Sequence, residues 1–573
     1  MISDTIGARN ALLSVSGMAM FALAAAAMPA SAATLLTPKA FTVKGPKLII
    51  PPNDVHLDTN GTSAPAFFSH TLNTSVISTF EGTSDYDTRA LGIGLLPPDT
   101  MGAVGTTQYV QLLNGSFSVY NKATGLLAQP RITDSTFWKA AGGTNTGGDP
   151  RVRFDTQNNR WIAIGFGSPN SKLQVAVSET DDALGKWHSS SFTGFAGFGF
   201  GAIADYPTLA MSGNAILIGT NDFAPIIAGG SNGFRGTTLN VLNKTDVFAA
   251  GAGSPNLSSL KQFVTPLDGT TDNGFALQGV NRVGGSSTAT VVAASLYTFD
   301  NVVYDITNAG TASAAQTTSQ YQQGGVSFNS PDKARQPTNN GSARVIDTLD
   351  ERISSSAWEM KGKIYFVTTV EALGTDHTVV RVTILDKATR AVLSQTDIGG
   401  GPSDSFDYYQ GSLAVNSAGQ IVVGYNRSGD ITTGQAGRIS IFARSFNTNA
   451  NGTLHATSGE VLIKQSLVDD YHNGSPQGSN PVGRQRWGDY STVELDPTNM
   501  HRFWVIGQFA REYNNAAGGH PGGSGFARWG TQIAQIGIAA VPEPATWAMM
   551  ILGFGFVGTA LRRSRIATKV TFA

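Results

Sequence analysis

The sequence predicts an all-β fold, and within that class a β-propeller of seven blades with an N-terminal signal peptide and a C-terminal transmembrane sorting helix. Glycine is abundant, at 67 of 573 residues, and only 14% of residues are charged, a composition typical of turn-rich exported β-proteins. Short runs of β-branched and aromatic residues recur between residues 33 and 540, separated by Gly, Asn, Asp and Ser. A unit that begins with an Asp recurs along the same stretch.

The composition excludes several classes of protein. The chain contains no cysteine, which excludes a disulfide scaffold, a cysteine-ligated metal site and thiol catalysis. Its formal net charge is −1, but without residues 1–32 and 541–573 the body has 34 basic and 38 acidic side chains, a net charge of −4. A mildly acidic body does not suit a phosphate backbone, so we expect no nucleic-acid partner.

Residues 1–32 are predicted to be a secretory signal peptide. Arg9 provides a basic start, residues 11–27 form an apolar stretch, and Ala30 and Ala32 are small residues at the −3 and −1 positions of a cleavage site. We expect signal peptidase to cut after Ala32. The alternative is an uncleaved N-terminal anchor, although the alanine-rich stretch is only weakly apolar.

Residues 541–566 are predicted to be a second sorting element. The tripeptide Pro542-Glu543-Pro544 precedes an apolar run at 545–561, and Arg562 and Arg563 follow that run. A helix over the run would be about 25 Å long, slightly short of a ~30 Å hydrocarbon core. The basic residues should remain cytoplasmic, which would leave the bulk of the chain outside.

This tail resembles the PEP-CTERM sorting signal in its PEPxxWA form, with Trp547 at the aromatic position. The same kind of tail is also catalogued as an ice-binding protein C-terminal domain. The resemblance covers only residues 541–566. It implies a Gram-negative bacterium that makes exopolysaccharide, transient anchoring in the inner membrane, and processing by an exosortase near the Pro-Glu-Pro tripeptide. A plain tail anchor without processing is the alternative.

Seven copies of the Asp-led unit divide the region 83–540. Each has an Asp, a short strand, a polar turn and a stronger strand, such as Trp161–Phe166 or Ile421–Tyr425. The seven Asp residues are Asp99, Asp149, Asp205, Asp272, Asp350, Asp407 and Asp489, of which the fourth belongs to the weakest copy. Such repeats, with two clear strands and room for two more, are typical of propeller blades. A single blade cannot bury both faces, so we expect the seven to close into one domain. The weak fourth copy leaves an eighth or a missing blade as the alternative.

Closing such a ring requires a strand that joins the last blade to the start of the body. Residues 33–82 are predicted to be an N-terminal extension, and Thr74–Phe80 within them could supply that strand. The segment Phe526–Ile538 offers one or two further strands after the last copy.

Several short motifs lie along the body, among them Leu95-Leu-Pro-Pro-Asp-Thr-Met-Gly, Gly148-Asp-Pro-Arg-Val-Arg-Phe-Asp, Asp205-Tyr-Pro, Asp350-Glu-Arg and Arg486-Trp-Gly-Asp-Tyr. With them the body, from about Phe80 to Phe509, resembles a family of large secreted bacterial proteins with a β-propeller-like fold and no settled activity. The resemblance implies the fold and assigns no catalytic residue.

The repeated Asp residues are the first candidate site. They precede the innermost strand of each predicted blade, so they should approach the mouth of the central channel. The candidates for binding are Asp99, Asp149, Asp205, Asp350 and Asp407. A ring of carboxylates could bind a hard cation such as Ca²⁺, which takes six to eight oxygen ligands. In the alternative, each Asp accepts hydrogen bonds from backbone N–H groups and shapes a tight turn.

The second candidate is the cluster Arg486-Trp487-Gly488-Asp489-Tyr490. At a funnel mouth, Arg486, Asp489 and Tyr490 could hydrogen-bond to a sugar and stack on its ring. The alternative is an Arg–Asp pair beside a core Trp that locks the last blade. Arg352, close to Asp350, allows the same two interpretations.

Catalytic motifs are scarce in the chain. The eight histidines show no metal-ligand spacing, and neither a Gly-x-Ser-x-Gly elbow nor a phosphate loop occurs. We therefore expect a non-catalytic cell-surface or matrix protein that binds polysaccharide or another envelope component, with no cofactor except the Ca²⁺ considered above. Paired carboxylates for glycoside cleavage can lie far apart in a chain. An extracellular glycan hydrolase or lyase with its site at the funnel is therefore the alternative, and a calcium-holding scaffold is a third.

Overall fold

The computed structural model describes residues 72–540 except 145–147, 168, 170–171, 196–202, 225–232, 250–252, 327, 338–343, 458, 469–470, 472–484 and 514–526, and also describes Phe554 and Val557. All of these residues belong to one of the two compact units of the chain. The predicted signal-peptide and sorting residues lie outside the described part, namely Ala30, Ala32, Pro542, Glu543, Pro544, Trp547, Arg562 and Arg563. Within the described part, no helix is long and apolar enough to cross a membrane.

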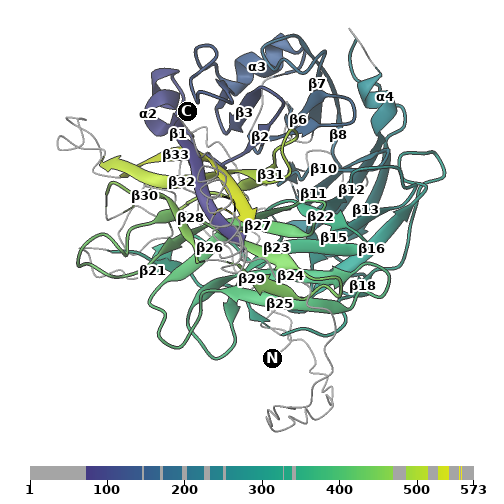
Figure 1. Ribbon diagram of the computed structural model, residues 1–573. Helices are drawn as coiled ribbons and strands as arrows, with labels where there is room; N and C mark the ends of the chain where they lie inside the picture. The colour runs from purple at the N-terminus through teal and green to yellow at the C-terminus, as the bar shows by residue number, and fades with distance from the viewer. Residues whose placement is uncertain are drawn as a thin grey trace, which may run out of the picture. The chain divides into compact units, whose positions relative to one another are not determined.

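The described residues form an all-β fold of successive antiparallel meanders (Figure 1). The first meander contains β2 (Gly102–Val104), β3 (Gln108–Leu113) and β4 (Ser116–Asn121). The second contains β5 (Arg151–Asp155), β6 (Arg160–Phe166), β7 (Lys172–Ser178) and β8 (Trp187–Thr193). The third contains β9 (Ile203–Asp205), β10 (Ala210–Ser212), β11 (Ala215–Phe223), β12 (Phe234–Asn243) and β13 (Lys261–Pro266).

The next two meanders share a sheet. One contains β14 (Phe275–Asn281), β15 (Ala289–Ala294), β16 (Asn301–Thr307), β17 (Ala315–Gln316) and β18 (Gln320–Tyr321). The other contains β19 (Phe328–Asn329), β22 (Ala357–Met360), β23 (Lys363–Ala372), β24 (Thr378–Asp386) and β25 (Val392–Ile398). A short parallel pairing of β14 with β22, with Val280 opposite Ala357, joins them into a ten-stranded sheet.

A further meander contains β26 (Asp407–Val415), β27 (Gln420–Ser428), β28 (Ser440–Thr448), β29 (Leu454–Ala456) and β30 (Val461–Gln465). The small pair β20 (Ala334–Arg335) and β21 (Arg344–Ile346) forms a two-stranded sheet of its own.

The last meander brings the two ends of the body together. It contains β31 (Thr492–Leu495), β32 (Arg502–Tyr513) and β33 (Ala527–Ala540), and β1 (Leu72–Ser84) is its outer strand. β1 runs antiparallel to β33, from Leu72 opposite Ala540 to Ser84 opposite Gly530. In Figure 1 the purple β1 lies beside the yellow β33. The chain therefore closes on itself through backbone hydrogen bonds between segments more than 400 positions apart.

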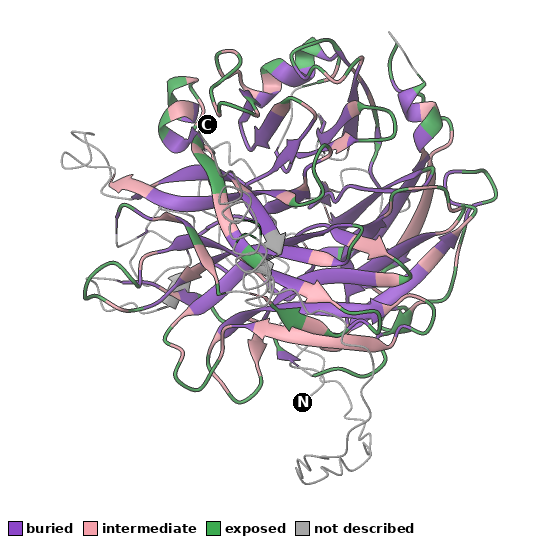
Figure 2. Ribbon diagram, in the orientation of Figure 1, coloured by how far each residue is buried: buried purple, intermediate pink, exposed green. Residues whose placement is uncertain are grey.

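The first strands of the meanders border a common axis, which makes the fold β-propeller-like. β2 contacts both β5 and β31, and a second series of contacts runs from β10 to β14, β22, β26 and β31. Between the two series, Arg151 of β5 donates to the Pro207 carbonyl, which lies between β9 and β10, at 2.9 Å. These strands are buried on both faces, as in β2 and β26, whose residues are all buried. Figure 2 shows buried residues along the strands and exposed ones mainly in the connecting loops. Continuous apolar runs such as Trp161–Phe166 are what a strand between two neighbouring sheets requires.

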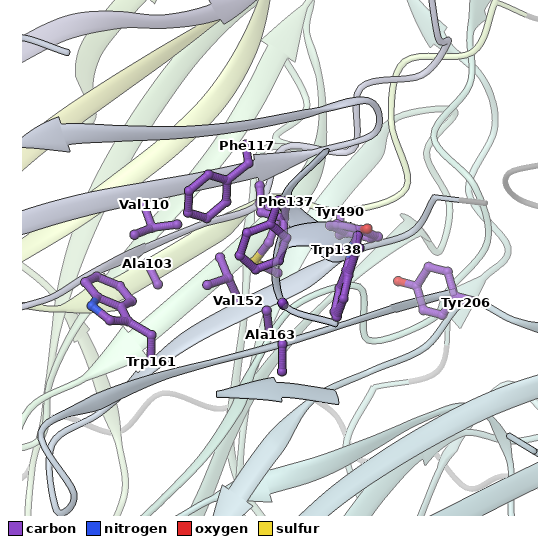
Figure 3. Packing of buried hydrophobic residues seen from close by; sticks show 14 of the residues in the cluster. Ala103, Val110, Phe117, Phe137, Trp138, Val152, Trp161, Ala163, Tyr206 and Tyr490 are labelled. Carbon is purple, nitrogen blue, oxygen red and sulfur yellow. The ribbon is translucent and has the colours of Figure 1, made fainter. Parts of the chain in front are cut away.

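Among the described residues, three short helices connect strands: α2 (Asp85–Ala90), α3 (Asp134–Ala140) and α4 (Lys244–Phe248). Each begins after a capping residue whose side chain accepts a backbone N–H, and Ser84 and Asp87 form a reciprocal capping box at α2. α3 adds Phe137 to the aromatic core between the first two meanders, where its ring stacks on Phe117 at 4.4 Å. Figure 3 shows these rings with Tyr206 and Tyr490 at one end of the same cluster.

Candidate functional site

The structure brings several of the predicted site residues together at the ends of the first strands. We call Asp99, Asp149, Asp489 and Arg486 the Asp–Arg cluster. The Arg486 guanidinium donates to the Asp489 carboxylate, and its Nε lies 3.7 Å from the Asp347 carboxylate. The Asp489 N–H donates to Asp99 at 2.7 Å. These contacts link the loop before β31 to the loop before β2.

Burial dominates the electrostatics of this cluster. It raises the pKa of Asp99 well above its usual range, and the neighbouring carboxylates of Asp489 and Asp149 raise it further. Burial likewise raises the pKa of Asp149, reinforced by Asp205 and Asp489. Neither carboxylate oxygen of Asp149 has a hydrogen-bond partner among the described residues. The acidic surroundings keep Arg486 positively charged, because their effect on its pKa outweighs that of burial.

Two arginines stack on the tyrosines beside the cluster. The Arg151 guanidinium lies 3.4 Å from the ring centre of Tyr490, and that of Arg352 lies 4.3 Å from the ring centre of Tyr206. Arg352 also makes two hydrogen bonds to the Asp350 carboxylate, at 2.6 and 2.7 Å. The Tyr490 hydroxyl donates to the Pro150 carbonyl at 2.9 Å.

Asp407 makes a separate set of contacts. Its carboxylate accepts from the Arg335 guanidinium at 2.8 and 2.9 Å, and also from the backbone N–H groups of Arg335 and Thr378. Asp205 belongs to β9 and pairs with Asn221 of β11. Of the predicted Asp residues, Asp489 therefore pairs with Arg486, and Asp99 and Asp149 interact with Arg486 electrostatically. Asp350 and Asp407 each hold an arginine of their own.

A left-handed backbone position recurs at the first strands. Asp99 and Asp149 occupy it, while Asp205, Asp350 and Asp407 lie one to three residues away from it. Asp149, Ala276 and Gln410 have φ of 51°, 50° and 52°. In each case, the residue two positions later lies in the first strand of its meander and pairs with the second strand. These residues are Arg151, Gln278 and Ser412. Asp149 is itself the left-handed residue, whereas Asp407 precedes that position by three residues. Asn and Asp tolerate this conformation better than most residues. An Asp is therefore favourable at this position in the second copy, where Asp149 occupies it, although Ala276 and Gln410 occupy it in other copies.

The Asp–Arg cluster does not face solvent. Asp99, Asp149, Asp489 and Tyr490 are fully buried, and Arg486 is 8% exposed. Trp487 is also fully buried, with its ring 4.6 Å from that of Tyr471 and its indole N–H donating to Asn426. Because these side chains are buried, a polysaccharide could not reach them without rearrangement of the protein. The described residues contain no group of three or more His, Cys, Asp or Glu side chains arranged to hold a metal ion.

A solvent-accessible pocket lies at the other end of the first strands. It has a volume of about 370 Å³, and we call it the turn pocket because the turns from first to second strands form its wall. Its principal side chains come from several meanders and are Arg153, Phe154, Asp155, Met211, Lys244, Arg282, Val283, Trp358, Glu494, Asp496 and Met500.

Ion pairs order the polar side of the turn pocket. Arg153 lies 3.1 Å from the Glu494 carboxylate and donates to the Ser356 hydroxyl at 2.6 Å. Its guanidinium is also 4.9 Å from the Trp358 ring. Lys244 makes a second ion pair with Asp155, two residues further along β5, at 2.9 Å.

Two carboxyl groups of the pocket have pKa values displaced in opposite directions. Burial raises the pKa of Glu494, and Arg153 offsets only part of this effect. Burial would also raise the pKa of Asp496, but hydrogen bonds from Lys122, Trp504 and Thr498 lower it below its usual value. Glu494 thus favours the protonated form more than a surface Glu does, while Asp496 is held as a carboxylate.

Sequence reasoning did not single out the turn pocket. Its residues belong to different copies of the repeat, and each is an ordinary strand-end or turn residue in its own copy. The one local signal is the alternation Arg151-Val-Arg153 on a strand expected to be innermost, which directs two guanidinium groups to the same face.

Comparisons with known proteins support the sorting tail and add little about activity. A model of the PEP-CTERM protein-sorting motif matches residues 540–565, which indicates sorting to the cell surface by an exosortase-type enzyme. No curated protein matches the chain in sequence.

Several solved structures show distant similarity, and three of them illustrate it. A protein of unknown function from Dyadobacter fermentans is 13% identical, with a TM-score of 0.36 and coverage of 81% of this chain and 99% of that one. The α-L-arabinofuranosidase Arb93A from Fusarium graminearum is 9% identical, with a TM-score of 0.31 and coverage of 80% and 97%. A thermostable family-43 glycoside hydrolase is 12% identical, with a TM-score of 0.26 and coverage of 69% and 94%. At these TM-scores the similarities say nothing about activity.

Proposed function

We propose that this protein is an exported, non-catalytic β-propeller of seven blades that binds glycan at the cell surface through the turn pocket. Export would begin with cleavage after Ala32 by signal peptidase, and the tail would anchor the chain in the inner membrane until an exosortase processes it. The partner would be exopolysaccharide or another glycan of the envelope.

The blade count rests on the meanders. Within the described residues, seven meanders can be distinguished by their innermost strands, which are β2, β5, β10, β14, β22, β26 and β31. The pairing of β1 with β33 would complete the last blade and close the ring.

The turn pocket is the observation that carries the proposal for binding. Its volume of about 370 Å³ falls within the ~300–1,000 Å³ common for small-molecule sites. It combines an aromatic ring, Trp358, with cationic and anionic groups such as Arg282 and Asp155. A sugar presents an apolar ring face and hydroxyl groups that both donate and accept, and this mixture of surfaces suits it.

Binding to an array of neutral and acidic glycans, followed by calorimetry on the positives, tests the proposal. Val283 is 68% exposed at the pocket, so Val283→Trp should obstruct it without disturbing the core. Val326, 55% exposed and outside the pocket, provides the matched control Val326→Trp. We expect Val283→Trp to weaken binding at least about tenfold, or about 1.4 kcal/mol, and Val326→Trp to leave it unchanged. Binding unaffected by Val283→Trp would exclude the turn pocket.

The hydrolase alternative has one observation in its favour, and that observation lies in the turn pocket. A glycosidase needs one protonated and one ionised carboxyl group, and the opposite pKa displacements of Glu494 and Asp496 resemble that requirement. Binding is favoured over hydrolysis because Glu494 is already paired with Arg153 and Asp496 with Lys122. Release of a chromogenic aglycone that Glu494→Gln abolishes, with binding retained, would establish hydrolysis instead.

A further inference from the structure

We propose that the turn pocket receives the terminal residue of a neutral glycan chain, not an internal stretch of polymer. This inference rests on the proposed function and specifies how the glycan is recognised. Three properties of the pocket lead to it: a closed floor, a wall contributed from several sides, and matched charges.

The floor is closed because side chains fill the axis beyond the pocket. Arg153 separates the turn pocket from a second cavity deeper among the first strands, which Met101, Gln278 and Thr492 also line. That cavity measures about 10 Å³, the space of about one water molecule. Arg153 is held there by Glu494 and Ser356. A polymer entering the turn pocket therefore cannot pass along the axis.

The wall is contributed from several sides. The turn from β5 to β6 supplies Thr156 and Gln157, the turn from β14 to β15 supplies Arg282 and Val283, and the loop from β31 to β32 supplies Met500. Because these turns belong to separate meanders around one axis, they enclose the space laterally. An internal segment of a polymer must enter and leave a site along an open groove, whereas a chain end needs only one opening.

The charges that line the pocket are matched. Arg153, Lys244 and Arg282 face Asp155, Glu494 and Asp496, so the lining has no net charge. The pairing within the lining is close for Arg153 with Glu494 and for Lys244 with Asp155. A carboxylated or sulfated sugar would leave the site with an excess of negative charge beside Asp155, Glu494 and Asp496, whereas a neutral sugar leaves the balance of charge unchanged.

Arg282 is the group best placed to hold such a sugar. Its side chain is 31% exposed, and its ion pair with Glu359 is long, at 3.5 Å. The Glu359 carboxylate makes a shorter contact with Lys387, at 2.6 Å. The planar guanidinium of Arg282 thus has N–H groups available to a pair of neighbouring hydroxyls. The volume of about 370 Å³ leaves room for about one or two sugar rings.

The experiment asks whether the amount of bound full-length protein follows the number of glycan chain ends or the mass of polymer. Linear dextran, mannan and galactan are immobilised at equal mass, before and after partial acid hydrolysis, and bound protein is measured at saturation. Oligosaccharides of increasing length from the same polymers are titrated by calorimetry. Alginate serves as the anionic polymer, and Val283→Trp and Val326→Trp serve as the blocked and control variants.

We expect the binding capacity to rise in proportion to the number of chain ends, and the affinity to stop increasing beyond about two sugar residues. Arg282→Ala should reduce affinity for the short oligosaccharides about tenfold. Capacity that follows polymer mass, or affinity that keeps rising with length, would overturn end recognition and leave the proposed function standing. Tighter binding of alginate would overturn the neutral class. No binding to any polymer or oligosaccharide would remove the proposed function as well.

Discussion

The Asp99 carboxylate accepts a hydrogen bond from the backbone N–H of Asp489 at 2.7 Å, across 390 positions of the chain. The same carboxylate accepts from the Asn114 side chain at 2.9 Å, and Asn114 in turn accepts from the backbone N–H of Asp149 at 2.8 Å. This series of hydrogen bonds joins the last meander to the first and the first to the second. All of its members are buried, so none of these groups can exchange its partner for water.

Replacing Asp99 tests the contribution of this junction to stability. Asp99→Ala should lower the free energy of unfolding by about 2 kcal/mol, because the buried N–H of Asp489 and the Asn114 amide lose their acceptor. Asp99→Asn should cost less, because Asn keeps an acceptor oxygen and tolerates the φ of 49° at this position. Urea denaturation measures both. Equal losses in the two variants would assign the effect to the negative charge of Asp99 instead.

The stability of the protein should depend on pH through Asp222. This buried carboxyl accepts from the hydroxyls of Thr220 and Thr238, and burial raises its pKa to about 8 despite those hydrogen bonds. In the unfolded chain the pKa is about 4. Between about pH 4 and pH 8, Asp222 therefore stays protonated in the folded state but is ionised in the unfolded state. The free energy of unfolding falls as the pH rises through this range.

Asp222→Asn removes this titration. The variant should match the wild type near pH 3, where the carboxyl is largely protonated in both states, and should exceed it in stability near pH 8. Burial also raises the pKa of Asp99 and of Asp149, so part of the fall in the free energy of unfolding with rising pH should persist in the variant. Free energies of unfolding at the two pH values test this, and an unchanged difference between them would contradict the assignment to Asp222.

The seam between β1 and the first meander should depend on Phe80. Its ring lies 5.2 Å from that of Tyr120 and 6.4 Å from those of Tyr109 and Trp504. Phe80→Ala should cost about 2–3 kcal/mol, less than a full core replacement because Phe80 is half-buried. Ile77, on the same strand and 47% exposed, provides the matched control, and Ile77→Ala should cost less than about 1 kcal/mol. Thermal unfolding of the two variants compares them, and similar losses would mean that the ring contacts add nothing.

Removal of divalent cations should leave the protein unchanged. The Arg486 guanidinium lies among the carboxylates of Asp489, Asp347 and Asp99, and it supplies there the positive charge that a bound Ca²⁺ would otherwise bring. We therefore expect the same Tm with and without a chelator. A Tm that falls with chelator and recovers with added Ca²⁺ would show that a cation binds within the Asp–Arg cluster after all.

The strand-rich fold could be predicted because its signals are local. The runs at 161–166 and 421–425 lie in β6 and β27, since β-branched and aromatic residues between polar turns favour extended backbone wherever they occur. The offset of Asp205, Asp350 and Asp407 from the left-handed position could not be predicted in this way. An Asp before a strand has the same local appearance whether it adopts the left-handed conformation, as Asp149 does, or pairs with an arginine, as Asp407 does.

The sequence by itself therefore determined the all-β character, the acidic body and the sorting motif of the tail, because each depends on composition or on neighbouring residues. Only the tertiary structure decided that the Asp–Arg cluster is buried and that the turn pocket is open. Asp99 and Asp489, like Arg153 and Glu494, are hundreds of positions apart, and they meet only when the meanders assemble around one axis. Their burial, which sets their pKa values and their accessibility to a ligand, exists only in that assembled state.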